Sequence, residues 1–120
     1  MNKKIKILCF LDFFYPGYKA GGPIKTILSM VQALNKEFDF YIVTRNHDLN
    51  SKNNYESVKH NEWVKVQGVN VYYMSKSQIS NFGLYSIIDK TPHDIVYFNS
   101  FFSFLFTGHI LLLLKFLNFK

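Results

Sequence analysis

Cysteine is almost absent from this chain of 120 residues, which contains Cys9 and no other. A single cysteine excludes an intramolecular disulfide and a metal site built from several cysteines. Because Cys9 lies within the apolar run 5–11, we expect it to be a small, buried core residue.

The chain also lacks a long basic run. Its net charge of +6 comes from 14 Lys and Arg against 8 Asp and Glu, and the basic residues are scattered beyond Lys3, Lys4 and Lys6. No zinc-finger or RNA-binding signature accompanies them, so we do not expect nucleic acid as a partner. The N-terminal lysines resemble the start of a signal peptide, but Asp12 ends the apolar run too early for one. We expect a cytoplasmic protein, either free or peripheral at the inner face of the membrane.

Two phosphate-binding motifs are missing, because neither the dinucleotide fingerprint G-x-G-x-x-G nor the P-loop pattern G-x-x-x-x-G-K-[ST] occurs. In their place stands a glycine-rich loop over residues 15–23. Its candidate ligand-binding residues are Gly17, Lys19, Gly21 and Gly22. Pro23 has its φ preset for the first helical position, which predicts Gly22 as the N-cap. The N–H groups at the start of such a helix attract anions such as a diphosphate. Alternatively, the glycines only turn the chain sharply.

The composition predicts a folded α/β protein. Hydrophobic residues make up 48% of the chain and aromatic residues 18%, which argues against disorder. Apolar or alternating runs predict strands over residues 5–11, 38–44, 69–74 and 95–98, with a short extended segment over 62–66. Helical periodicity predicts helices over residues 23–35 and, although Gly83 interrupts the pattern, over 78–90. The first strand, helix and second strand are expected to form a right-handed βαβ unit.

Polar residues follow two of the predicted strands. Arg45 and His47 open a polar loop over residues 45–61, and Asn99 and Ser100 come directly after the strand at 95–98. Loops at the carboxyl ends of parallel strands line the ligand crevice of open α/β sheets, so we expect Arg45 on the same side as the glycine loop. Arg45, Asn99 and Ser100 are therefore candidate ligand contacts. The alternatives are a solvated loop residue for Arg45 and a helix cap for the Asn-Ser pair.

The stretch over residues 101–117 is the most apolar part of the chain. A membrane-spanning helix needs about 20 apolar residues, and this run is interrupted by Ser103, Thr107, Gly108 and His109. We therefore expect it to pack on the sheet or on a partner rather than to cross a bilayer.

Three segments, in order along the chain, resemble the N-terminal domain of glycosyltransferase family 4. They are Lys6-Ile7-Leu8 to Asp12-Phe13-Phe14-Tyr15-Pro16 with the following Gly21-Gly22-Pro23, then Phe40–Arg45, then Pro92–Ser100. The resemblance implies the GT-B fold, in which two Rossmann-like domains face each other across a cleft, and transfer of a sugar from a nucleotide-sugar donor to an acceptor. Residues 1–120 would then be an incomplete N-terminal half-domain, a partial Rossmann-like parallel sheet with flanking helices.

The resemblance also implies which substrate, cofactor and further domain the reaction would require. Sugar transfer in the family is metal-independent and uses no cofactor, since the nucleotide sugar is a substrate that a C-terminal domain mainly holds. The glutamate-bearing donor motif of that domain has no counterpart here, and Asn99-Ser100 stands where family members often carry a histidine, so no catalytic residue is assigned. We expect a glycosyltransferase-like chain of polysaccharide biosynthesis that is inactive alone and prone to self-association. The alternative is a non-catalytic protein that uses residues 101–117 to bind a partner or a membrane surface.

Overall fold

The computed structural model describes residues 4–19 and 21–98. In chain order these contain β1 (Ile5–Phe10), α1 (Gly22–Leu34), β2 (Phe38–Arg45), β3 (Trp63–Val66), β4 (Val69–Met74), the 3-10 helix η1 (Lys76–Gln78), α2 (Asn81–Lys90) and β5 (Ile95–Phe98). The sequence predictions for Asn99, Ser100 and the apolar stretch 101–117 lie outside the described residues.

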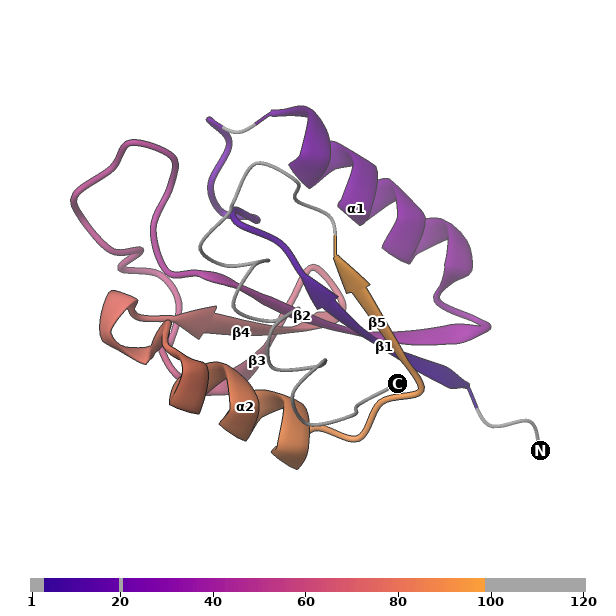
Figure 1. The fold of residues 1–120 in the computed structure, drawn as a ribbon. Helices are drawn as coiled ribbons and strands as arrows, with labels where there is room; N and C mark the ends of the chain where they lie inside the picture. Colours follow the sequence, from indigo (N-terminus) through magenta and orange to yellow (C-terminus); the bar gives the residue numbers. More distant parts are fainter. Residues whose placement is uncertain (1–3, 20, 99–120) are drawn as a thin grey trace.

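The five strands form one sheet in the order β3-β4-β2-β1-β5 (Figure 1). β1 is parallel to both β2 and β5, and β2 is parallel to β4. The expected α/β class is confirmed, and β1 lies inside the sheet, as expected for a strand that is apolar along most of its length. The extended segment predicted at 62–66 is β3, which lies beside β4.

A two-residue turn makes β3 antiparallel to β4. Its residues Gln67 and Gly68 have φ angles of 52° and 79°. Positive φ at both central residues defines the type I′ turn, whose twist matches that of a hairpin. The sheet is therefore mixed, whereas the sequence predicted a parallel sheet.

Alternate residues of the strands feed two separate hydrophobic clusters, one on each face of the sheet. From the strands, the cluster under α1 contains Cys9, Phe40, Ile42, Val69, Val71 and Tyr73. The cluster under α2 contains Leu8, Phe10, Val43 and Met74. Because side chains of a strand point alternately to opposite faces, a continuous apolar run is needed to fill both clusters. The sheet thus lies between α1 and α2 (Figure 1).

α1 begins one residue earlier than predicted, because Gly21, not Gly22, is the N-cap. Gly21 has a φ of 70°, which a glycine adopts without the steric penalty that a Cβ brings. Its carbonyl oxygen accepts hydrogen bonds from the N–H groups of Ile24 and Lys25. Pro23 therefore stands in the first turn, where its missing N–H costs no helical hydrogen bond. The helix ends before the C-cap Asn35, as expected.

α2 begins at Asn81, later than the predicted residue 78, because Lys76–Gln78 form the separate turn η1. Ser80 is the N-cap, and its Oγ accepts a hydrogen bond from the N–H of Gly83 at 3.2 Å. Gly83 does not interrupt the helix. It allows η1 to pack closely, since a Cβ at this position would lie 1.9 Å from the carbonyl oxygen of Gln78.

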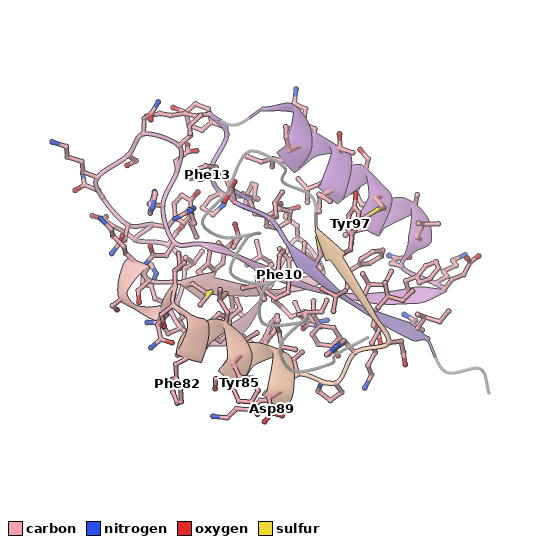
Figure 2. All side chains as sticks on the ribbon, in the orientation of Figure 1. Phe10, Phe13, Phe82, Tyr85, Asp89 and Tyr97 are labelled. Atoms are coloured by element: carbon pink, nitrogen blue, oxygen red, sulfur yellow. The ribbon has the colours of Figure 1, made fainter. Side chains whose placement is uncertain are left out.

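β5 is an edge strand of the described sheet, and β1 is its neighbour there. Asp94 fastens its start: the Lys6 N–H donates to the Asp94 carboxylate at 2.8 Å, and the Asp94 N–H donates to the Lys6 carbonyl oxygen at 2.8 Å. The side chains of Ile95 and Tyr97 are 46% and 38% exposed, and Figure 2 shows Tyr97 on this strand. Within residues 4–19 and 21–98, no helix has the length and apolar character needed to cross a bilayer.

Candidate functional site

Two loops meet at the carboxyl edge of the sheet, where β1 leads into residues 11–21 and β2 leads into residues 46–62. The Tyr55 hydroxyl donates a hydrogen bond to the Phe14 carbonyl oxygen at 3.3 Å. The Tyr73 hydroxyl, which comes from β4, donates to the carbonyl oxygen of Tyr15. The backbone of the glycine loop is therefore hydrogen-bonded by one tyrosine from the sheet and by another from the polar loop.

Asp48 joins the two loops through its carboxylate. This carboxylate accepts hydrogen bonds from the backbone N–H groups of Tyr18 at 3.1 Å, Lys19 at 3.3 and 3.4 Å, and Leu49 at 2.8 Å. The residue is 8% exposed. Burial acts to raise the pKa of the Asp48 carboxyl, but the N–H donors and the Lys19 ammonium outweigh it and hold the pKa below its usual value. Asp48 is therefore an ionised internal anion that occupies two N–H groups of the glycine loop.

Gly17 is packed against this junction. A Cβ at Gly17 would lie 2.2 Å from the Tyr55 hydroxyl oxygen and 2.9 Å from Asp48 Oδ1. Its N–H donates to the Phe14 carbonyl oxygen at 2.9 Å. The absence of a side chain at Gly17 therefore makes room for Tyr55 and Asp48, and its backbone N–H belongs to a turn within the loop.

Lys19 lines an open hollow of about 390 Å³, together with Pro16, Tyr18, Asp48 and Tyr55. The side chain of Tyr18 is 76% exposed. Lys19 brings a cation to this hollow and Tyr18 and Tyr55 bring two rings, but Asp48 and Glu56 bring two carboxylates. The rings suit a flat or ring-shaped apolar surface, and an anionic group of the same ligand would have to approach Lys19 itself.

Arg45 lines a second hollow, of about 400 Å³, together with Asp12, Phe13 and His47. Its Nε donates to Asp12 Oδ1 at 3.4 Å, and both side chains are less than one fifth exposed. His47 places a ring nitrogen 2.9 Å from its neighbour's carbonyl oxygen and lies edge-on to Phe13, with ring centroids 5.8 Å apart. Arg45 is thus at the predicted edge of the sheet. A ligand that contacts its guanidinium would have to share this group with the Asp12 carboxylate.

Gly21 and Gly22 lie at the start of α1, directly after the glycine loop, and neither is among the residues that line the two hollows. The N-cap makes no side-chain hydrogen bond to the helix. Among the described residues, a Cβ built on either glycine would meet nothing within 4 Å beyond its chain neighbours and its own helix. The Gly21 N–H donates to the Tyr18 carbonyl oxygen at 3.0 Å, and Pro23 has no N–H. An anion at this end would therefore interact with the helix dipole rather than with a row of unpaired N–H groups. Of the residues predicted for the site, Gly17, Lys19, Gly21, Gly22 and Arg45 lie at this edge, whereas Asn99 and Ser100 lie outside the described residues.

Sequence reasoning missed the residues that shape the site: Asp48, Tyr55 and Tyr73. Asp48 and Tyr55 lie in a polar loop without periodicity, where no local pattern marks a contact 30 residues away. Tyr73 is a buried residue of β4 that faces α1. A buried tyrosine hydroxyl needs a hydrogen-bond partner, and here the partner is a carbonyl oxygen of the loop at the end of the sheet. That partner could not be named without the fold.

A third hollow lies away from this edge. It has a volume of about 420 Å³ and is lined at the amino edge of the sheet by Lys4, Lys36, Asp39, Lys65 and Asn70, among others. Ligand crevices of open α/β sheets form at the carboxyl edge, so size alone does not make this hollow the candidate site.

Comparison with known proteins provides no relative from which the residues of this site could be assigned. No family model, no curated protein and no solved structure matches this chain. In the parts of the chain that the structure describes, no group of three or more His, Cys, Asp or Glu side chains is placed to hold a metal ion.

Proposed function

We propose that this chain is a glycosyltransferase family 4-like N-terminal half-domain with a partial Rossmann-like sheet, which provides one wall of a sugar-transfer cleft in a GT-B arrangement. The observation that carries the proposal is the meeting of the β1 and β2 loops at the carboxyl edge, with Gly21 and Gly22 opening α1. This is the place at which open α/β sheets bind their ligands. The sequence resemblance supplies the class of reaction.

In this proposal the ligand's phosphate groups approach Lys19 and the start of α1, where the positive end of the helix dipole favours an anion. Arg45 lies nearer the second hollow and contacts the acceptor or donor there. Asn99 and Ser100 remain predicted contacts. Gly17 serves the packing of the loop, and no residue is assigned as a catalytic base.

A second domain, on this or another polypeptide, would supply the other wall and hold the nucleotide. Without that wall the donor is not oriented against an acceptor, so proximity and transition-state stabilisation are both lost. We expect the 120-residue chain to release no nucleotide from common sugar nucleotides. Measurable turnover by the purified chain would contradict this mechanism.

Binding at the loop is testable on the chain alone. Uridine diphosphate and UDP-glucose should shift the backbone amide resonances of residues 18–22 more than those of the amino edge, with weak, millimolar affinity. Gly22→Ala is the matched variant, because its added methyl meets none of the described residues within 4 Å, apart from its chain neighbours and its own helix. We expect it to weaken binding at least about fivefold, since only a ligand approaching the backbone meets the methyl. Shifts confined to the amino edge, or none at all, would reject the proposal.

A second candidate function is binding of a partner or of a second copy through the edge of the sheet. It is favoured by β5, whose Ile95 and Tyr97 side chains are 46% and 38% exposed. Exposed edge strands pair readily with other chains. Size-exclusion chromatography with light scattering would show a concentration-dependent dimer, which Ile95→Lys should abolish.

Flotation with anionic vesicles would test peripheral association with the cytoplasmic membrane face.

A further inference from the structure

The Tyr18–Lys19 segment is fixed by a residue far along the chain. Both N–H groups donate to the Asp48 carboxylate, 29 or 30 residues away, at 3.1 to 3.4 Å. Neither residue belongs to a helix or a strand. The segment is therefore held by this carboxylate rather than by a regular hydrogen-bond ladder.

An external phosphate competes poorly for these two N–H groups. The carboxylate of Asp48 is already in place, 8% exposed and bound by a third N–H from Leu49. An intramolecular group has a high effective concentration, which a weakly bound ligand does not match. The segment thus presents to the hollow the side chains of Tyr18 and Lys19 rather than their N–H groups.

We propose that Asp48 is a positioning residue, which holds the backbone of Tyr18 and Lys19 so that the Lys19 side chain lines the hollow. The identity of the phosphate-bearing ligand rests on the proposed function; the positioning of the loop does not. Preorganisation of this kind raises affinity by removing the ordering cost of the loop from the binding step.

The charged and titratable groups around Asp48 come from both loops. The Lys19 ammonium and the Tyr55 phenol face it, the His47 ring bonds its carbonyl oxygen, and Glu56 lines the same hollow. Glu56 provides the matched control, because Glu56→Ala removes one negative charge from the hollow without removing a hydrogen bond to the loop.

The decisive experiment measures amide exchange and amide shifts of Tyr18 and Lys19 by NMR. Asp48→Ala should raise exchange at these two amides by at least about tenfold, since each loses its acceptor, whereas Glu56→Ala should leave them unchanged. Formate, a free carboxylate, should restore the wild-type shifts in Asp48→Ala in a saturable way. In the wild type, both amide shifts should follow a single titration below the usual range of an aspartate.

Inorganic pyrophosphate serves as the ligand probe. Removing a negative charge alone raises affinity for an anion, so Glu56→Ala should bind pyrophosphate up to about threefold more tightly. Asp48→Ala should bind it at least about fivefold more weakly, because Lys19 is no longer held. The two variants are therefore expected to change the affinity for pyrophosphate in opposite directions. This difference distinguishes a positioning role of Asp48 from the effect of its charge alone.

Three results would overturn the inference: wild-type exchange in a folded Asp48→Ala protein, no response of that protein to formate, or tighter pyrophosphate binding by Asp48→Ala than by Glu56→Ala. Asp48→Asn, which retains one acceptor oxygen, should show an intermediate exchange rate. Global unfolding of both Asp48 variants would assign the residue to overall stability and reject the positioning role. A wild-type chain that shows the loop response but binds no pyrophosphate would support the inference and contradict the proposed function.

Discussion

Replacing Gly83 with alanine should destabilise the protein, although alanine is the better helix former. Within a helix, Gly→Ala usually stabilises by about 0.5–1 kcal/mol. At Gly83, however, the new Cβ would lie 1.9 Å from the carbonyl oxygen of Gln78, where ordinary contact begins near 3.4 Å. Either η1 or the first turn of α2 must move by more than 1 Å. Overpacking of this kind costs about 1–3 kcal/mol, so we expect a net loss of up to about 2 kcal/mol.

The single tryptophan provides the assay. Trp63 is half-buried and lies edge-on to Tyr41 and Tyr72, with ring centroids 5.5 and 5.4 Å apart, so its fluorescence reports on the α2 side of the sheet. Urea unfolding should give a lower midpoint for Gly83→Ala. A melting temperature measured in parallel should fall by about 3–6 °C for each kcal/mol lost.

Gly22→Ala is the control for this prediction. Apart from its chain neighbours and its own helix, the Cβ meets no described residue within 4 Å. The residue precedes Pro23, however, and a Cβ before proline disfavours helical backbone. The two effects oppose each other, so the free energy of unfolding should change by less than about 1 kcal/mol. If Gly83→Ala were as stable as the wild type while Gly22→Ala also stayed unchanged, the close approach of η1 to α2 would be refuted.

Three further predictions concern Cys9, Ser80 and the phenols of Tyr55 and Tyr73. Burial raises the pKa of the Cys9 thiol to about 12, so a thiol reagent at pH 8 should label it only after unfolding. Ser80→Ala should cost about 1 kcal/mol in urea unfolding because it removes the N-cap acceptor; a change below 0.3 kcal/mol would contradict this role. Burial also raises the pKa of the Tyr55 and Tyr73 phenols. Their contribution to stability is complete below about pH 10 and is lost as pH rises further, so ultraviolet absorbance should show their ionisation only with unfolding.

Much of the sheet could be predicted because each strand carries its own signal. The apolar run of β1 and the β-branched and aromatic residues of β2 and β4 indicate strands from a few neighbours alone. The helical period after the glycine loop gives α1 to within a residue. Its N-cap was misplaced because Gly21 and Gly22 are equivalent in sequence, and only the backbone conformation shows which of them has positive φ.

The direction of β3 and the contacts of the loops could not be predicted, because they depend on residues distant in sequence. The Gln67 φ of 52° makes the hairpin, yet glutamine carries no strong turn signal. Likewise, Asp48 looks like any solvated loop carboxylate until the fold brings it to Tyr18. The position of the candidate site followed from sheet topology, whereas its internal contacts required the three-dimensional structure.

The junction between the two loops also determines where the chain can tolerate an insertion. The Tyr55 N–H donates to the Asn46 carbonyl oxygen at 2.8 Å, and His47 bridges to Asn54, so the ends of this excursion are closed. Its tip carries exposed Lys52 and Asn53. Exposed tips between closed ends accept inserted segments readily. A peptide tag or a small domain placed between Lys52 and Asn53 should therefore leave the sheet intact and provide a handle beside the candidate site.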